Sequence, residues 1–135
     1  MGILESSTAN LRFAGDDLVP SHVTSLLGHS PSGSQLKGEV LRVSKDRTRI
    51  SKTGCWRLSA TARQPADLES QVFEILSMLT PDLTVWASLA PYEPDLFCGI
   101  FMASGNDGLP LSSKALLALA QRGISLDLDI YHAGD

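Results

Sequence analysis

The segment from Asp95 to Tyr131 constrains the fold more than any other part of this chain, because a recognisable signal marks each of its boundaries. Apolar side chains alternate in two rows from Asp95 to Ala103, and residues that accept turn dihedrals fill the run from Ser104 to Gly108. Since both rows are apolar, we expect a central strand that is covered on both faces.

A helix and a second strand are predicted to follow this turn. Ser112 is a good N-cap because its hydroxyl can accept a hydrogen bond from a free first-turn amide, and Gly123 suits the left-handed position after a helix. Three apolar residues at helical spacing form the expected buried stripe: Leu116, Leu119 and Ala120. Residues 125–131 then alternate apolar and polar side chains, which predicts a strand with one apolar and one polar face.

The segments before Asp95 predict further strands and helices. They are a strand around Leu11 and Phe13, a short helix from Pro20 to the C-cap Gly28, strands over 36–43 and 54–61, a helix capped by Asp67, and a short helix that restarts at Thr80-Pro81. A strand is the alternative for the last of these. We expect the strands over 36–43 and 54–61 to form a hairpin with a long polar tip, and residues 1–9 to be a flexible tail.

Together these elements predict an α+β protein in the order β-α-β-β-α-α-β-α-β. We expect residues 10–135 to form a single domain, with a mostly antiparallel sheet of about five strands and helices packed on it. A chain of 135 residues is large enough to bury an ordinary core. The predicted core contains Phe13, Leu26, Trp56, Leu58, Val72, Leu76, Trp86, Ile100, Leu116 and Leu128.

Composition argues against several classes of function. The net charge of −4 argues against general affinity for nucleic acids, since that affinity rests on neutralising phosphates. No apolar run approaches the roughly 20 residues of a membrane helix, and residues 1–10 lack the pattern of a secretory signal. Cys55 and Cys98 stand alone and are too few to close a structural zinc site, so we expect reduced thiols in a cytoplasmic protein.

Aspartates in turns are the candidates for chemistry. Clustered carboxylates bind Mg²⁺ or Ca²⁺ or act as acid and base, and predicted turns contain Asp16, Asp17 and Asp107. Aspartate is also common in turns because its side chain bonds nearby backbone amides, which is the simpler interpretation here. The sequence contains no HExxH or GxSxG motif and no P-loop. We therefore assign no catalytic residue, cofactor or metal ligand, and retain a metal-dependent hydrolase using the turn aspartates as the alternative function.

The distribution of charge is more informative. Seven of the eleven basic residues fall between Lys37 and Arg57, where only Glu39 and Asp46 oppose them. Such a segment can bind an acidic protein or a nucleic-acid backbone, or it can be a solvated tip whose charges discourage aggregation of the sheet. The candidate interaction surface comprises Arg42, Lys45, Arg47, Arg49 and Lys52, together with the acidic residues Asp127 and Asp129 of the last predicted strand. Opposite charges on these two segments raise the possibility of a homodimer.

Several short motifs resemble a bacterial family, the domain of unknown function 4279. They are Gly15-Asp16-Asp17-Leu18, Leu26-Leu27-Gly28, Trp56-Arg57-Leu58 and the segment from Leu109 to Tyr131, which closes with Leu126-Asp127-Leu128-Asp129-Ile130-Tyr131. The resemblance covers nearly the whole chain beyond the tail and supports the fold. Val19 departs from it, because an acidic helix cap is expected there. The family implies no reaction, cofactor or catalytic residue.

The preferred functional hypothesis is a non-enzymatic protein-interaction or regulatory module, with an immunity-like protein as one form of it. The hypothesis rests on the missing catalytic and cofactor motifs and on the segregated charge. Its expected partner is another protein or a second copy of the chain, with no association with membranes.

Overall fold

A ten-residue strand, β2 (Ser6–Gly15), lies at the centre of the main sheet in this computed structural model, which describes residues 2–132. Its side chains alternate between the two faces of the sheet, as the pleat of a strand requires. The row on one face is buried and consists of Ser7, Ala9, Leu11 and Phe13. The row on the other face is only half-buried and mostly polar, so the two faces of the sheet differ from the centre outwards.

Five strands make up the main sheet, in the spatial order β3-β6-β2-β7-β9. Their bounds are β3 Gly33–Gln35, β6 Gly54–Ser59, β7 Asp95–Phe101 and β9 Ser125–Tyr131. All neighbours are antiparallel except β7 and β9, which run parallel. A parallel pair needs a crossover connection, and a helix between β7 and β9 provides it. The predicted α+β class and mostly antiparallel sheet are confirmed.

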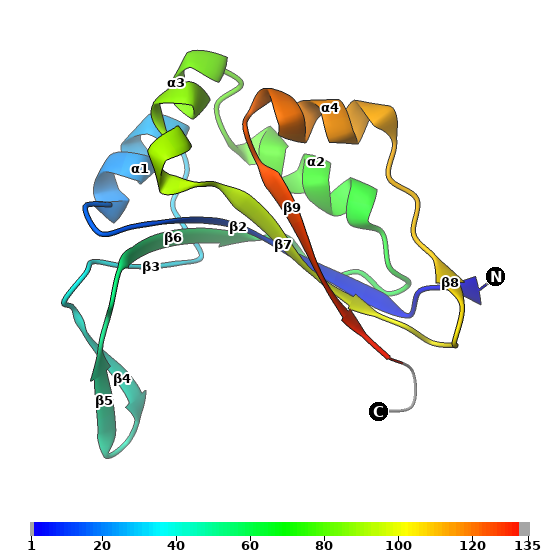
Figure 1. The fold of residues 1–135 in the computed structure, drawn as a ribbon, viewed down its shortest axis with the longest axis horizontal. Helices are drawn as coiled ribbons and strands as arrows, with labels where there is room; N and C mark the ends of the chain where they lie inside the picture. The colour runs from blue at the N-terminus through cyan, green and yellow to red at the C-terminus, as the bar shows by residue number, and fades with distance from the viewer. Residues whose placement is uncertain (1, 133–135) are drawn as a thin grey trace.

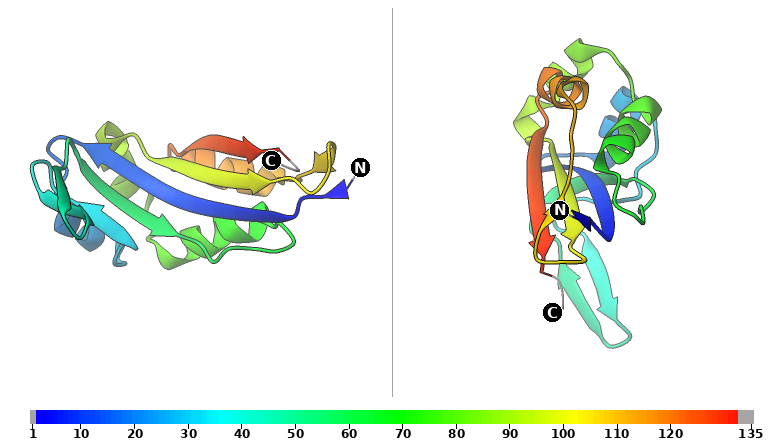
Figure 2. Two further views of the ribbon diagram at one scale, coloured as in Figure 1. Left: turned by 90° about the horizontal axis from the view of Figure 1, so that it is seen from below. Right: turned by 90° about the vertical axis from the view of Figure 1, so that its right-hand side faces the viewer.

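The helices all lie on one side of this sheet (Figure 1). They are α1 Pro20–Leu27, α2 Leu68–Met78, α3 Leu83–Ser88, the 3₁₀ helix η1 Ala90–Tyr92 and α4 Ser113–Gln121. The core forms between them and the sheet, where the Phe13 ring packs against the rings of Trp56 and Trp86. Within residues 2–132 no helix lies on the opposite face of the sheet (Figure 2).

Two smaller pairs of strands extend the structure. β4 (Val40–Ser44) and β5 (Arg47–Ile50) form an antiparallel hairpin, and β1 (Gly2–Ile3) pairs in parallel with β8 (Asp107–Gly108). The predicted pairing of 36–43 with 54–61 is wrong, because β2 and β3 occupy both edges of β6. Part of the expected polar tip is instead the strand β5, which folds back on β4 through the turn at Lys45-Asp46.

The N-terminal segment forms strands where the sequence predicted a tail over residues 1–9. Residues 6–9 belong to β2, and the side chains of Ser7 and Ala9 are buried. The Ser7 hydroxyl donates to Oε1 of Gln71 at 2.7 Å, and the Gln71 amide donates to the Ser7 carbonyl at 2.8 Å. A buried glutamine on α2 thus anchors the beginning of the strand.

Several local predictions also change. Asp82, rather than Thr80, caps α3, since its carboxylate accepts from the Thr84 amide. Leu116 is 48 % exposed because α4 turns Ala115 and Leu119 towards the core, and Leu128 is 42 % exposed because β9 is an edge strand. β7 is covered on one face rather than both, since the helices gather on one side. The other eight predicted core residues are buried, apart from Leu26, which packs partly buried against the core.

Candidate interaction surface

The face of the main sheet opposite the helices, hereafter the open face, carries polar and aromatic side chains. It begins with the half-buried row of β2 and continues onto β7 and β9, where the strand register brings their side chains together. Its principal members are Thr8, Asn10, Arg12, Arg57, Asp95, Phe97, Phe101, Asp127, Asp129 and Tyr131. This surface combines charged side chains with aromatic rings, whereas the face under the helices is apolar.

Arg12 is held in the middle of the open face by two carboxylates and a ring. Its Nε donates to Asp95 Oδ1 at 2.8 Å and its Nη2 donates to Asp95 Oδ2 at 2.6 Å, which is the two-point geometry favoured by guanidinium and carboxylate. Asp127 Oδ2 lies 3.6 Å from the same Nη2, and the guanidinium carbon lies 4.4 Å from the centre of the Phe97 ring. The hydrogen bonds with Asp95 raise the pKa of Arg12 above its ordinary value.

A second carboxylate and ring group lies further along the same strands. The Tyr131 hydroxyl donates to Asp129 Oδ2 at 2.7 Å, and its ring stacks on Phe101 with centroids 4.7 Å apart and planes 5° from parallel. The hydrogen bond with Asp129 raises the pKa of Tyr131. No Lys or Arg side chain within residues 2–132 forms an ion pair with Asp129, so this group resembles the Arg12 environment without its cation.

The basic hairpin, defined as residues 37–52, projects from one end of the sheet on its open side (Figures 1 and 2). All five basic residues proposed for interaction are exposed: Arg42, Lys45, Arg47, Arg49 and Lys52. Three apolar side chains are exposed among them, Val40 at 65 %, Val43 at 56 % and Ile50 at 66 %. From Val40 to Ile50 only Leu41 is even partly buried. The hairpin thus presents mixed basic and apolar side chains that the rest of the described chain leaves uncovered.

The structure separates the predicted basic segment into two parts. Lys37 lies at the base of the hairpin and pairs with Asp16 at 3.2 Å. Arg57 lies on β6 instead, where its guanidinium sits so close to Gly33 that a Cβ there would approach its carbon to 2.8 Å. Its Nη1 also lies 3.4 Å from the Cys55 sulfur. Arg57 therefore belongs to the open face, while the other basic residues of the predicted segment lie in the hairpin.

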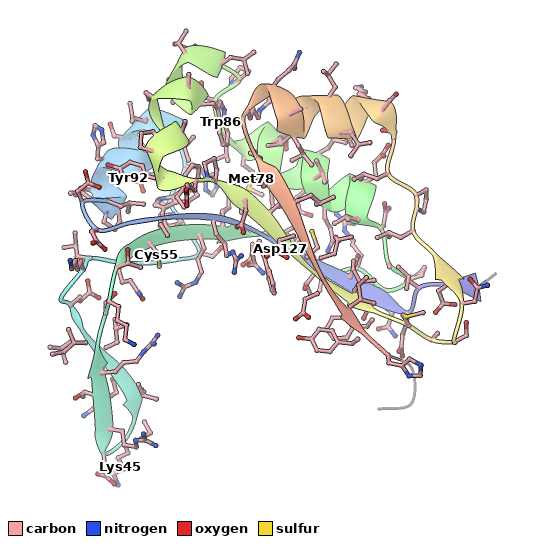
Figure 3. The ribbon with its side chains drawn as sticks, viewed as in Figure 1. Lys45, Cys55, Met78, Trp86, Tyr92 and Asp127 are labelled. Atoms are coloured by element: carbon pink, nitrogen blue, oxygen red, sulfur yellow. The ribbon has the colours of Figure 1, made fainter. Side chains whose placement is uncertain are left out.

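The predicted acidic partners lie away from the hairpin. Asp127 and Asp129 are on the edge strand β9, at the other side of the sheet from β3 and β6. Figure 3 shows Lys45 at the far tip of the hairpin, well separated from Asp127. The structure thus does not bring the two halves of the predicted surface together within one chain.

A shallow pocket opens on the open face, beside the ion pair of Arg12 and Asp95. Its volume is about 340 Å³, and Arg12, Arg57, Tyr92 and Glu93 are among the residues that line it. The Tyr92 ring packs where a Cβ of Gly15 would stand, which holds one wall in place. The open face is therefore indented near the hairpin as well as charged.

The turn aspartates are engaged locally. Asp107 Oδ2 accepts the Ala103 and Ser104 amides at 2.7 and 2.9 Å, and bonds from the Ser104 hydroxyl and amide lower the pKa of Asp107. Asp16 accepts a hydrogen bond from Lys37. It lies far from Asp107, because Asp16 follows Gly15 at the end of β2, whereas Phe101 pairs with Ser6 at the beginning of β2. Within residues 2–132 no three His, Cys, Asp or Glu side chains are grouped to hold a metal ion.

The two cysteines are free thiols in different environments. Cys98 is buried in β7, and burial raises the pKa of its thiol to about 12. Cys55 is half-buried on the open face beside Arg57. None of the helices in residues 2–132 has the length and apolar character needed to cross a membrane.

These features define a single α+β module with one helix-covered face, one open face and a projecting basic hairpin. The chain belongs to the family described as domain of unknown function (DUF4279), whose model matches residues 5–133. Comparisons with curated proteins and with solved structures gave no match.

Sequence reasoning identified the hairpin cations and the β9 aspartates but missed Arg12 and Phe97. The signal for Arg12 was the polar row of β2, in which Thr8, Asn10 and Arg12 alternate with buried residues. The two apolar rows of residues 95–103 predict a strand covered on both faces, and this expectation leaves no open face for Phe97. A full alternation analysis starting at Ser6 would have revealed that face.

Proposed function

We propose that this protein is a non-enzymatic protein-interaction module of regulatory type, which binds a carboxylate-bearing protein surface through its basic hairpin and open face. The observation that carries the proposal is the hairpin itself. It extends away from the core and exposes basic and apolar side chains that no other element of the described chain covers.

The exposed apolar side chains favour a binding role over a solvated tip. A strand edge that only needs protection from aggregation is served by charges alone. Here Val40, Val43 and Ile50 are each more than half exposed, at the positions between the charges. Protein interfaces commonly combine an apolar centre with a polar rim, and arginine is enriched in them. The hairpin supplies both apolar and basic side chains within the eleven residues from Val40 to Ile50.

The charge pattern favours an acidic protein as the partner. Outside residues 37–57 the chain has four basic and thirteen acidic residues, so the positive field is confined to one part of the molecule. Such a field steers a negatively charged partner towards the hairpin. A nucleic acid would have to approach Asp127 and Asp129 as well, if it occupied the open face, and phosphates would be repelled there. The partner is therefore another acidic protein or a second copy of this chain.

The free thiols support a reducing compartment for this activity. Cys55 is half-buried and Cys98 is buried, and neither forms a disulfide. Unpaired cysteines are typical of the cytoplasm, where thiols are kept reduced. We accordingly propose the bacterial cytoplasm as its location.

Complex formation by hairpin variants tests the proposal. The purified protein is analysed by size exclusion with light scattering, and immobilised protein is used to retain partners from a lysate. We expect a complex, with itself or with another protein, that Arg47→Glu weakens strongly. Lys114→Glu is the matched control, because it changes the net charge equally on α4. A chain that stays monomeric and retains no protein in a hairpin-dependent manner would contradict the proposal.

A further inference from the structure

Building on the proposed function, we infer that the partner is a second copy of this chain. The two copies face each other with their open faces, related by a two-fold axis. The basic hairpin of each copy reaches the end of the other's β9 and places its arginines beside Asp129 and the stacked rings of Phe101 and Tyr131. Two observations carry this inference: the opposite charges of the basic hairpin and β9, and their positions at opposite ends of the sheet.

The shape of the molecule suits such a pairing. The hairpin and the C-terminal end of β9 extend on the same, open side of the sheet, at its opposite ends (Figures 1 and 2). A two-fold axis roughly along the viewing direction of Figure 1 exchanges these ends. Each hairpin then meets the partner's β9, and the same contact forms twice. A closed, isologous dimer of this kind is the commonest symmetric assembly.

The open face already binds one guanidinium in the way the dimer requires. Arg12 lies 4.4 Å from the Phe97 ring centre, with Asp95 and Asp127 as its anionic partners. Asp129, Phe101 and Tyr131 repeat the combination of carboxylate and aromatic ring on the same two strands. Because no Lys or Arg of the described chain pairs with Asp129, this second position is available to a guanidinium from outside. Tyr131 orients the carboxylate through its hydroxyl.

The spacing of the charges matches on the two strands. Arg47 and Arg49 are two residues apart on β5, so their side chains lie on one face of that strand. Asp127 and Asp129 are likewise two apart on β9. Residues so placed are separated by about 6.5 Å on any strand, so both ion pairs can form at once. Asp127 is partly neutralised by Arg12, which leaves Asp129 as the stronger acceptor.

Facing copies would also shield apolar side chains of the hairpin. Val40 and Ile50 pair directly with each other on the face of the hairpin away from Arg49, so they flank the contact with β9 rather than entering it. A stable interface needs about 800 Å² from each partner, close to one-tenth of the 7856 Å² surface of this chain. A dimer of this kind must therefore bury an area of that order, chiefly in its two hairpin contacts.

Complementary charge reversal tests this arrangement. One variant carries Arg47→Glu and Arg49→Glu, and the other carries Asp127→Lys and Asp129→Lys. In a mixed pair every reversed hairpin meets a reversed β9, whereas each variant alone opposes like charges at both contacts. We expect the wild type to dimerise at tens of micromolar in about 0.05 M salt, each variant to be monomeric, and their equimolar mixture to dimerise again. Raising salt to about 0.5 M should weaken the wild-type dimer, because screening then acts well within 10 Å.

Folding is checked for both variants by a cooperative thermal transition. If Asp127→Lys disturbs the Arg12 contacts and the protein unfolds, Asp129→Lys alone replaces it, since the Arg12–Asp127 contact is then kept. A wild-type dimer that persists in the reversed variants, or a mixture that stays monomeric, would overturn the proposed interface. A wild type that is monomeric at every concentration but captures another protein through its hairpin would overturn the second-copy inference and leave the proposed function standing.

Discussion

Arg12 and Asp95 occupy directly paired positions on β2 and β7 and join the two strands by a two-point ion pair across the open face. Their side chains remain 42 % and 24 % exposed. The pair therefore organises a surface rather than a core. It holds the Arg12 guanidinium over the Phe97 ring, while Asp127 of β9 stays exposed.

Replacing Arg12 with Met should lower the free energy of unfolding by about 1 kcal/mol, because exposed ion pairs contribute little and this one is strengthened by its geometry. A double-mutant cycle with Asp95→Asn, measured by urea unfolding, gives the coupling directly. We expect a coupling of about 0.5–1 kcal/mol. A coupling near zero would mean that the pair is a geometric coincidence of the strand register.

Asp67 should make stability depend on acid pH. The Ser70 hydroxyl and amide donate to its two carboxylate oxygens at 2.7 and 3.1 Å and lower the pKa of Asp67. A carboxylate with a lowered folded pKa stabilises the fold above its unfolded pKa of about 3.9, and the contribution disappears as pH falls through the folded pKa. Asp67→Ala should cost about 1 kcal/mol at pH 7 as a lost N-cap. The difference from wild type, followed by urea unfolding, should shrink as pH falls below the unfolded pKa of about 3.9 and through the lowered folded pKa; a constant difference would contradict the assignment.

The two thiols should react very differently in the folded protein. Burial raises the pKa of Cys98 to about 12, so its thiol remains protonated near neutral pH, and only the thiolate is an effective nucleophile. Cys55 is partly exposed on the open face. A thiol reagent at pH 8 should modify Cys55 readily and Cys98 only after denaturation, as resolved by mass spectrometry of peptides. Rapid labelling of Cys98 in the native state would show that β7 opens easily.

Divalent cations should leave thermal stability unchanged. Asp107 already accepts three hydrogen bonds within its own turn, and Asp16 pairs with Lys37 beyond the other end of the sheet. Binding to the native state must raise the melting temperature by mass action. We expect shifts in melting temperature below about 1 °C with millimolar Mg²⁺, Mn²⁺, Ca²⁺ or Zn²⁺. A bound ion would be easy to detect, because at a hundred times its dissociation constant it would stabilise the fold by about 2.7 kcal/mol. A clear rise, abolished by Asp16→Asn or Asp107→Asn, would favour the metal-dependent hydrolase.

Local signals in the sequence were sufficient for much of the fold. Asp67 and Ser112 cap their helices as predicted, and Gly28 and Gly123 adopt the left-handed conformation with φ of 83° and 69°. These features depend on neighbouring residues only. The alternation of 125–131 also correctly predicted β9.

Tertiary relationships were less predictable. Nothing in residues 54–61 indicates that β2 and β3, rather than 36–43, occupy their edges. Leu128 looks like a core residue by alternation, but β9 is at the edge of the sheet, where cover is incomplete. The cations of the candidate surface could be read from composition, whereas the Arg12 group required knowing which strands are neighbours.

Hydrogen exchange of the hairpin amides tests the central claim most directly, because it reports which surface becomes covered on binding. The hairpin is exposed in the isolated chain, so amides of residues 40–50 that lie outside the β4–β5 pairing should exchange quickly. In the assembled state, with another copy or a captured protein, we predict slower exchange across residues 40–50, and no such change for Arg47→Glu/Arg49→Glu under the same conditions. An assembly that protects another surface while the hairpin exchanges as fast as before would contradict the account.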